Sequence, residues 1–326
     1  MDQDRLVRLE SSHFAMGTVF SVVAYGSEAA LLQEAIDRAF QEIDRLENLM
    51  SHYKPDSVLS RINRDAARHP VPVTPELFEL LENCLTYSRQ TDGAFDITIG
   101  PLMKLWGFFS RCGRVPAHSE LAETLQRIGY RHVKLDPQAR AVAFDRPGVE
   151  LDLGAIGKGY AIDRAVATLR AQGIAQALIS SGSSSIYALG APPREQGWEV
   201  SLCHPLDRRR QARSLRLRNL SISISGAHEQ RFVLDGKMYG HLLDPRTAIP
   251  VENMLMTVVI AESNAASDAL STAFFVSGPD PSRAYLQDHP NLSVLFYKST
   301  TSPRHFEEMR LASSVNSLSA DRFAAI

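Results

Sequence analysis

The sequence predicts an α+β protein in which a mostly antiparallel sheet core is flanked by helices. Three observations support this fold class. The 326 residues have an ordinary soluble composition with 44% hydrophobic residues, so the chain can bury a large core. Amphipathic helical patterns occupy the first third of the chain. The second half contains β-rich runs that are separated by Ser, Gly and Pro.

The first third predicts one strand and two helices. Residues 14–25 are rich in β-branched and aromatic side chains and predict an early strand. Residues 28–50 place apolar side chains three and four positions apart, with charges between them, which predicts an amphipathic helix. A second helix is predicted from Thr74, which can cap it before a proline, to the turn at 91–93.

The middle of the chain predicts short strands and a glycine-rich helix start. Strands are predicted at 133–135 and 141–144, separated by an Asp-Pro turn. The glycine-rich segment 154–159 then opens a helix at 160–172, which Gly173 closes.

The second half predicts the main sheet. Four β-rich runs are expected to be strands of one mostly antiparallel sheet: 174–189, 197–203, 214–225 and 255–262. Residues 190–197 are expected to be a loop because Pro192-Pro193 cannot continue a strand. A final helical pattern covers 263–276. We expect a single domain over 1–326, with two closely packed subdomains that divide near 130–150.

Composition excludes several classes of protein. A net charge of −2 without a basic tail argues against a nucleic-acid partner. Cys84, Cys112 and Cys203 are too few and too widely spaced for a metal knuckle or a disulfide framework. The longest apolar run is far shorter than the ~20 residues of a spanning helix, so no membrane span is predicted. The first residues have no export signal or lipidation Cys, which predicts a cytoplasmic location.

Two segments are suited to phosphate chemistry. Leu151-Asp-Leu-Gly-Ala-Ile-Gly-Lys-Gly-Tyr160 joins glycines and a lysine to a helix start, where backbone N–H groups can bind an anion. A helix cap with a surface lysine would give the same pattern. Tyr239-Gly-His-Leu-Leu-Asp-Pro-Arg-Thr247 places a histidine and an aspartate beside a turn, where they can transfer protons. A structural histidine and an Asp turn cap would also explain that segment.

Two further segments complete the set. Asp268 and Thr272 lie four positions apart in a helical pattern, so their oxygens can share a cation such as Mg²⁺ or form a structural hydrogen bond. Thr91-Asp-Gly-Ala-Phe-Asp96 runs into the aromatic stretch 100–108, which can stack on a ring system. Taken alone, that stretch is interpreted as core packing.

These segments, in this order, resemble the ApbE family, the FAD:protein FMN transferases. The resemblance extends from Met16-Gly17-Thr18, through Ser51-His-Tyr-Lys-Pro-Asp-Ser57 and Arg61-Ile-Asn63, to Ser267-Asp-Ala-Leu-Ser-Thr272. It implies an ApbE-like fold and Mg²⁺-dependent transfer of FMN from FAD to a Thr or Ser hydroxyl, with release of AMP. The acceptor would be a flavoprotein, such as a membrane redox subunit. Relatives are often periplasmic lipoproteins, which conflicts with the cytoplasmic prediction.

The resemblance also assigns residues to roles. The implied metal ligands are Asp268, Thr272 and the main-chain carbonyl of Gly157. His241 is the expected base, with Asp244 as its orienter or as a competing base. The residues expected to bind the flavin dinucleotide are Met16, Tyr53, Ser57, Asn63, Asp96, Lys158, Asp163, Ser225, Gly226 and Thr247.

Three positions depart from the family pattern. Gly157 stands where an alanine is usual, and a carbonyl ligand does not need a Cβ. Ser183 and Ala248 stand where the family has glycine, so either could be strained if its φ must be positive.

Three alternatives to the transferase are considered. Water could attack in the same site, giving an FAD pyrophosphatase that releases FMN and AMP. The chain could instead carry flavin without catalysis, or it could be a structural domain with a fortuitous resemblance.

Overall fold

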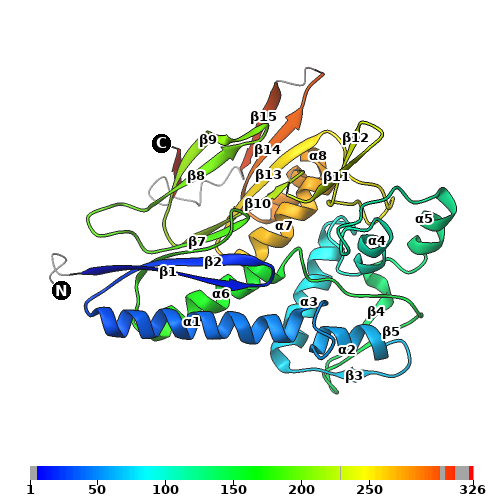
Figure 1. Ribbon diagram of the computed structural model, residues 1–326, viewed down its shortest axis with the longest axis horizontal. Helices are drawn as coiled ribbons and strands as arrows, with labels where there is room; N and C mark the ends of the chain where they lie inside the picture. The colour runs from blue at the N-terminus through cyan, green and yellow to red at the C-terminus, as the bar shows by residue number, and fades with distance from the viewer. Residues whose placement is uncertain (1–5, 228, 302–304, 313–322, 326) are drawn as a thin grey trace.

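The centre of the molecule is an eight-stranded sheet, which can be followed in Figure 1. The computed structural model describes residues 6–227, 229–301, 305–312 and 323–325. From edge to edge, the strands are β1 (Val7–Ala15), β2 (Thr18–Gly26), β6 (Gln176–Ser181), β7 (Ser185–Leu189), β10 (Leu220–Gly226), β13 (Met254–Ala261), β14 (Ser293–Ser299) and β15 (Phe306–Ala312). Every neighbouring pair is antiparallel, which confirms the predicted fold class.

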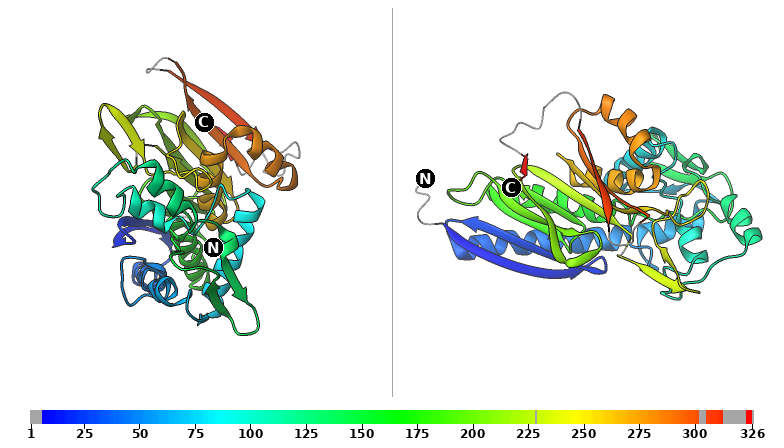
Figure 2. Two further views of the ribbon diagram at one scale, coloured as in Figure 1. Left: turned by 90° about the vertical axis from the view of Figure 1, so that its right-hand side faces the viewer. Right: turned by 90° about the horizontal axis from the view of Figure 1, so that it is seen from above.

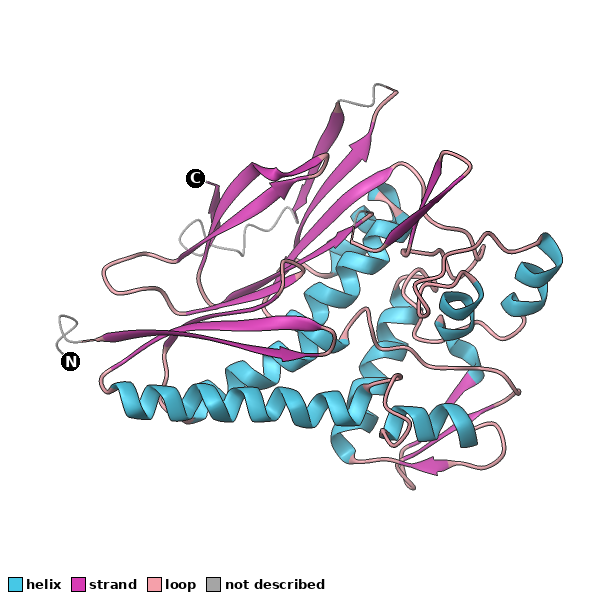
Figure 3. Cartoon of the chain, viewed as in Figure 1, coloured by secondary structure: helices cyan, strands magenta, loops and turns pink. Residues whose placement is uncertain are grey.

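Helices cover one face of this sheet, as Figure 3 shows. They are α1 (Ala29–Met50), α6 (Gly157–Ala171), α7 (Asn264–Ser277) and α8 (Pro279–Asp288). Phe20 of the sheet, Ile36 of α1 and Phe274 of α7 are buried in the shared core. The predicted helices at 28–50 and 263–276 are confirmed as α1 and α7.

A second, three-stranded sheet covers the other face. It contains β8 (Trp198–His204), β9 (Asp207–Leu217) and β16 (Phe323–Ala325). The prediction that 197–203 and the first part of 214–225 belong to the main sheet is therefore wrong. The main sheet is apolar on both faces. In β10, Leu220 and Ile222 pack against the second sheet, whereas Ser221 and Ser223 point to α7. A strand sequence does not state which sheet it joins.

The remaining elements gather at one end of the sheet, on the right in Figure 1 and towards the viewer in the left panel of Figure 2. They are α2 (Val58–Asp65), β3 (Val71–Pro72), α3 (Pro75–Gln90), α4 (Gly100–Leu105), α5 (His118–Leu125), η2 (Tyr130–His132), β4 (Val133–Asp136), β5 (Ala141–Phe144), β11 (Arg231–Leu234) and β12 (Lys237–Gly240). The predicted second helix is α3, and Thr74 caps it by accepting a hydrogen bond from the Leu77 N–H at 3.4 Å. The strands predicted at 133–135 and 141–144 are confirmed as β4 and β5.

Three predicted strands each span a turn that sequence patterns did not separate. Residues 14–25 contain the turn between β1 and β2, where Gly17 has φ +72°. Residues 174–189 form the hairpin β6–β7, which turns at Gly182 with φ +56°. Residues 214–225 contain the end of β9 and all of β10, divided at Asn219 with φ +51°. In each case the predicted strand is interrupted by a residue with a left-handed backbone conformation.

Other predictions can be compared directly with the structure. Helix α6 begins at Gly157 and not at Tyr160, so the glycine-rich segment is itself the first turn. The loop at 190–197 is confirmed. Cys84 is buried, whereas Cys112 and Cys203 are exposed, and all three are free. Within the part of the chain that the structure describes, no helix combines the length and apolar character needed to cross a membrane. The N-terminal residues behind the cytoplasmic prediction lie outside the described ranges, and the division near 130–150 stays a prediction.

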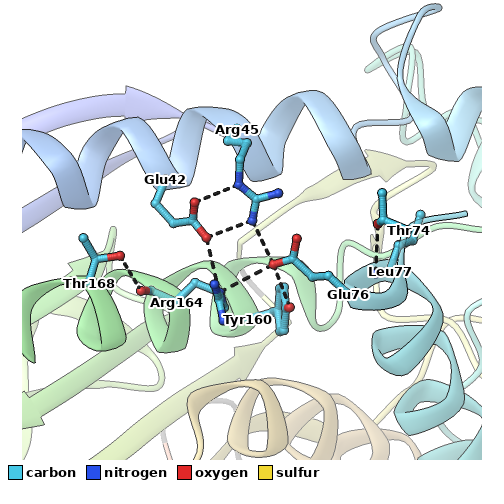
Figure 4. A network of polar contacts seen from close by, with 8 residues as sticks. All are labelled: Glu42, Arg45, Thr74, Glu76, Leu77, Tyr160, Arg164 and Thr168. Carbon is cyan, nitrogen blue, oxygen red and sulfur yellow. Dashed lines mark hydrogen bonds and ion pairs between the residues drawn. The ribbon is translucent and has the colours of Figure 1, made fainter. Parts of the chain in front are cut away.

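Polar side chains tie α1 to α3 and α6, as Figure 4 shows. Arg45 of α1 donates to Glu42 on its own helix at 2.7 Å and to Glu76 of α3 at 2.8 Å. From α6, Tyr160 donates to Glu76 at 3.0 Å and Arg164 donates to Glu42 at 3.2 Å. Three helices are therefore joined at the N-terminal half of α6, which fixes the position of the glycine-rich turn.

Candidate active site

Asp268 is buried where α6 and α7 cross. Its side chain accepts hydrogen bonds from the Gly159 N–H at 2.9 Å and from the Ser185 hydroxyl at 3.2 Å. A Cβ on Gly159 would overlap the Asn264 carbonyl oxygen and lie 2.7 Å from the Asp268 Cβ, so only glycine allows this approach. Burial raises the pKa of Asp268, and the charge of Lys158 opposes that shift.

Lys158 follows Gly157 in the first turn of α6. Its ammonium donates to the Ser184 hydroxyl at 2.7 Å, and Ser184 in turn donates to the Ser181 carbonyl at 3.2 Å. The charge of Lys158 also acts on the titration of His241 and Asp268. Two segments that are far apart in the sequence therefore converge around one lysine.

Thr272 lies one turn after Asp268 on α7, beside the end of β10. Its hydroxyl oxygen lies 3.2 Å from that of Ser225, which also lies 2.8 Å from the Ser271 hydroxyl oxygen. Gly226 ends the same strand. Asp268, Thr272, Ser225 and Gly226 are therefore neighbours at the junction of helix and sheet.

This junction can accommodate a hard cation. No group of three His, Cys, Asp or Glu side chains in the described ranges is placed to hold a metal ion, so such a cation would also need hydroxyl, carbonyl or water ligands. The two hydrogen bonds to Asp268 leave acceptor capacity on a carboxylate that offers about four lone-pair sites. With the Thr272 hydroxyl and the nearby main chain of Gly157, every donor is oxygen, the ligand type that Mg²⁺ prefers. The residues present fit the metal.

His241 lies just after the β11–β12 hairpin. The backbone N–H of His241 donates to the Gln230 carbonyl at 3.0 Å, and Nδ1 of its imidazole ring lies 3.1 Å from the same oxygen. A carbonyl only accepts, so Nδ1 carries the proton and Nε2 keeps a free lone pair. Burial lowers the pKa of His241 to about 4, and Lys158 lowers it further, while the Gln230 hydrogen bond opposes them. The imidazole is therefore neutral at physiological pH and can act as a base.

Asp244 binds its own turn and not the imidazole. Both of its carboxylate oxygens accept hydrogen bonds from the Arg246 guanidinium at 2.9 Å. The Gln230 carbonyl takes the orienting position that the sequence suggested for Asp244. Thr247 is exposed at the rim of the same turn.

Ala248 and Ser183, the two positions where the family has glycine, behave differently. Ala248 has φ +63°, so the predicted strain is confirmed there. The concern about Ser183 is wrong, because the left-handed residue of that turn is Gly182. At Gly157 an added Cβ would meet only Met50 and Leu153, at 3.9 and 4.0 Å, so the alanine that is usual there would fit.

Aromatic side chains border the site near Asp152. Tyr53 is 67% exposed, and its ring lies 3.9 Å from that of His52. His52 is stacked on Phe109 at 4.2 Å, and its Nδ1 lies 3.4 Å from a carboxylate oxygen of Asp152. Asp152 also accepts from the Gly154 N–H at 2.8 Å, so the aromatic cluster lies beside the glycine-rich segment.

Trp106 of the aromatic stretch is 2% exposed and packs against Phe232 and Tyr239 of the hairpin, which confirms core packing. Its indole N–H donates to the Ala248 carbonyl at 2.9 Å. The 244–248 turn is therefore attached to a buried core.

Several predicted flavin residues have structural hydrogen bonds in this structure. Asp163 accepts from the first N–H groups of α7, at 2.8 Å from Asn264 and 2.9 Å from Ala265. Asn63 exchanges two hydrogen bonds with the backbone of Leu151, at 2.9 and 2.7 Å. These side chains position the segments that carry Lys158 and Asp268, and their direct contact with a flavin stays a prediction.

The remaining predicted residues also support local structure. Ser57 caps α2 by accepting from the Ser60 N–H at 2.9 Å. Asp96 is buried and accepts from the Tyr130 N–H at 2.7 Å. The Met16 N–H donates to Glu47 at 2.6 Å, which fixes the β1–β2 turn.

Sequence reasoning missed several residues of the site. Gly159 and Ser184 directly follow Lys158 and Ser183, which the sequence analysis singled out. Asking whether each flanking residue could pack closely or form a hydrogen bond would have identified both. The fold alone brings the Gln230 carbonyl to His241 and His52 to Asp152, and it also brings Glu229 within the electrostatic influence of Lys158.

The fold and the site together define an α+β protein with a glycine-rich helix start that carries Lys158, a buried carboxylate near a Thr hydroxyl and a neutral imidazole, a set suited to transfer of a phosphorylated group. The chain belongs to the ApbE family, whose sequence model matches residues 16–296.

Comparison with known proteins supports the same assignment. A protein of Klebsiella pneumoniae (strain 342) named FAD:protein FMN transferase is 34% identical over 283 residues, which are 86% of each chain. A protein of the same name from Treponema pallidum is 32% identical over 308 residues, covering 90% of this chain and 85% of that protein. The crystal structure of the ApbE protein from Thermotoga maritima has a TM-score of 0.85 and 28% identity, covering 96% and 99% of the two chains. The flavin transferase ApbE from Vibrio cholerae has a TM-score of 0.81 and 26% identity, covering 95% and 98%.

Proposed function

We propose that this chain transfers the FMN part of FAD to a Thr or Ser hydroxyl of an acceptor protein and releases AMP. One observation carries the proposal: the first turn of α6 places Lys158 next to Gly159, whose N–H donates to the buried Asp268 at 2.9 Å, and the charge of the same lysine lowers the pKa of His241. The names of the relatives as FAD:protein FMN transferases support the same reaction.

The reaction requires one bond to form and one to break. The acceptor hydroxyl oxygen forms a bond to the phosphorus of the FMN half, and its proton moves to Nε2 of His241. The bond between that phosphorus and the bridging oxygen breaks, and its electron pair leaves with the phosphate of AMP. The protein's contribution is positioning and electrostatic stabilisation, which dominate phosphoryl transfer.

Asp268, Thr272 and the Gly157 carbonyl would hold Mg²⁺ in this site. When bound, the ion supplies charge neutralisation at the diphosphate and at the leaving AMP. Lys158 then provides a second positive charge from the helix start, and the packing of Gly159 against α7 keeps the carboxylate in place.

The acceptor is a flavoprotein with an accessible Thr or Ser, such as a membrane redox subunit. Its hydroxyl must reach His241, which directly follows the β11–β12 hairpin and is partly exposed. The cytoplasmic location stays a prediction, and cell fractionation with an antibody against this chain would test it.

Mass spectrometry tests the proposal. The chain is incubated with FAD, Mg²⁺ and a candidate acceptor or a peptide that carries a Thr, and the acceptor is examined for covalently added FMN. We expect a mass increase that disappears in Asp268→Asn. Free FMN and AMP with an unmodified acceptor would instead identify a pyrophosphatase. Bound FAD that is never turned over at any Mg²⁺ concentration would identify a carrier.

A further inference from the structure

Three consecutive arginines, 208–210, lie at the start of β9, directly after the turn of the β8–β9 hairpin. The two strands pair up to His204 and Asp207, so the arginines extend from the tip of the hairpin. The Arg209 side chain is 92% exposed, and its Nε lies 3.3 Å from Asp207. Arg208 instead reaches the turn between β6 and β7, where it donates to the Ser183 hydroxyl at 2.9 Å. One arginine of the three therefore enters the surroundings of the candidate site.

The turn that holds Arg208 also holds Lys158. Ser183 accepts from the guanidinium, and the next residue, Ser184, accepts from the ammonium at 2.7 Å. The backbone of the turn is fixed from two sides, because Ile224 donates to the Ser184 carbonyl at 2.7 Å and Gly182 donates to the Val19 carbonyl at 2.8 Å. Two full positive charges are thus held on adjacent residues of a rigid turn.

Two acidic side chains accompany these two cations. Burial raises the pKa of Glu229, and the charges of Lys158 and Arg208 both oppose that shift. Asp268 contributes in the same direction as burial. Lys158 and Arg208 both act on Glu229, and Gly159, the residue after Lys158, donates to Asp268 at 2.9 Å, so two positive and two negative side chains belong to this region. A cation bound at Asp268 would leave this region positive and ready for an anion of about two charges.

We propose that Arg208 binds the diphosphate bridge of the dinucleotide as a second cation beside Lys158. A guanidinium presents its donors in a planar fork that matches phosphate oxygens, and Ser183 is a neutral partner that an anion can replace. Arg208 exchanges its hydrogen bond to Ser183 for charge-assisted hydrogen bonds to the diphosphate. This inference rests on the proposed function and names a residue that supplies affinity for its substrate.

Binding measurements on two matched variants test the inference. Arg208→Ala and Arg209→Ala each remove one positive charge from the same hairpin, and only Arg208 contacts the Ser183 turn. Affinities are measured by calorimetry with Mg²⁺ present for three probes: FAD, ADP, which has a diphosphate but no flavin, and riboflavin, which has no phosphate. We expect Arg208→Ala to bind FAD and ADP about tenfold more weakly, and riboflavin within about twofold of the unmodified chain. Arg209→Ala should leave all three within about twofold.

The outcomes are distinct. Equal losses in both variants would show that only the net charge of the hairpin matters, and an equal loss of riboflavin would show a general disturbance of the site. Either result overturns the role of Arg208. Failure of the unmodified chain to bind FAD would count against the proposed function itself. Thermal unfolding of both variants checks that the exposed substitutions leave the fold intact.

Discussion

The deep and outer sides of the candidate site are built in different ways. On the deep side, Asp268 lies between two packed helices and accepts from the backbone of Gly159, an approach that tolerates no side chain. On the outer side, His241 follows an exposed hairpin, and the Gln230 carbonyl orients its ring. A charge that must be fixed in place is held by the core, whereas a base that must meet an incoming protein lies where that protein can reach it.

Removal of the deep carboxylate should have the largest effect. Asp268→Asn keeps the shape of the side chain but loses the negative charge, so we expect the rate of FMN transfer to fall by about 10³-fold or more. Quantitative mass spectrometry of the acceptor measures this rate. Asp280→Asn, at an exposed position in the first turn of α8, is the matched control and should transfer normally. A near-normal rate of FMN transfer in Asp268→Asn would show that the charge of this buried carboxylate is not required for the reaction.

Loss of the outer base should be smaller. His241→Gln should slow transfer by about 10²- to 10³-fold, because general base catalysis typically contributes in that range. FAD affinity should change little, since the deep side supplies the phosphate contacts. Calorimetry with FAD separates these two effects. A variant that loses binding and transfer together would show that the imidazole holds the substrate.

The pH dependence of His241 follows from its burial. Its pKa is about 4 in the folded chain against an ordinary 6.5, so the neutral base should persist well below pH 6 and the acid limb of kcat/KM should lie near pH 4. The unfolded chain binds this proton first as the pH falls. Burial of His241 therefore lowers the free energy of unfolding progressively from about pH 6.5 to about pH 4. Urea unfolding of the parent and of His241→Gln at about pH 7.5 and pH 5 should show a smaller loss in the variant.

The two glycines that flank Lys158 allow the packing of α6 against α7 to be tested. Gly159→Ala should lower the free energy of unfolding by about 2–3 kcal/mol, because the new methyl group would overlap α7. Gly157→Ala is the control, since its methyl group would make ordinary contacts, and it should raise stability by about 0.5 kcal/mol. Chemical denaturation measures both. Similar free energies of unfolding in the two variants would mean that α6 and α7 can move apart to accept a methyl group at position 159 with little loss of stability.

The smallest effect is expected at Asp244. Its partner is a partly exposed arginine of the same turn, so Asp244→Asn should cost less than about 1 kcal/mol of stability. Transfer should fall by no more than about threefold, with an unchanged pH profile, because Gln230 orients the imidazole. A change in the low-pH side of the pH–rate profile of Asp244→Asn would instead indicate that Asp244 orients His241.

Local patterns predicted the helices better than the strands. The segment 28–50 forms a helix because its apolar stripe and its charges follow the helical period, and α3 begins at the Thr74 cap. The strand runs were located, but Met16-Gly17 and Asn219 were included within them. Gly17 and Asn219 are residue types that favour left-handed backbone, but glycine also occurs inside strands and the preference of Asn is only several-fold, so the pattern did not separate these turns from the strands they join.

Individual residues of the candidate site were proposed from the sequence, but the contacts between them were not. Asp268, Lys158 and His241 were assigned from motifs, and the structure places Lys158 next to the Gly159 N–H that binds Asp268, while their roles stay predictions. The contact of Gly159 with α7, the role of the Gln230 carbonyl and the tether between Arg208 and Ser183 depend on how distant segments pack. Spacing along one segment carries no information about such approaches.

The two tryptophans of the chain are divided between opposite parts of the molecule. Trp198 donates to the Leu189 carbonyl at 3.0 Å and belongs to the apolar layer between the sheets, whereas Trp106 is hydrogen-bonded to Ala248. Replacing Trp198 with phenylalanine would leave a single indole as a native fluorophore beside the 244–248 turn. Energy transfer from that indole to an isoalloxazine ring would let arrival and departure of the flavin be timed in a stopped-flow instrument, without any attached dye.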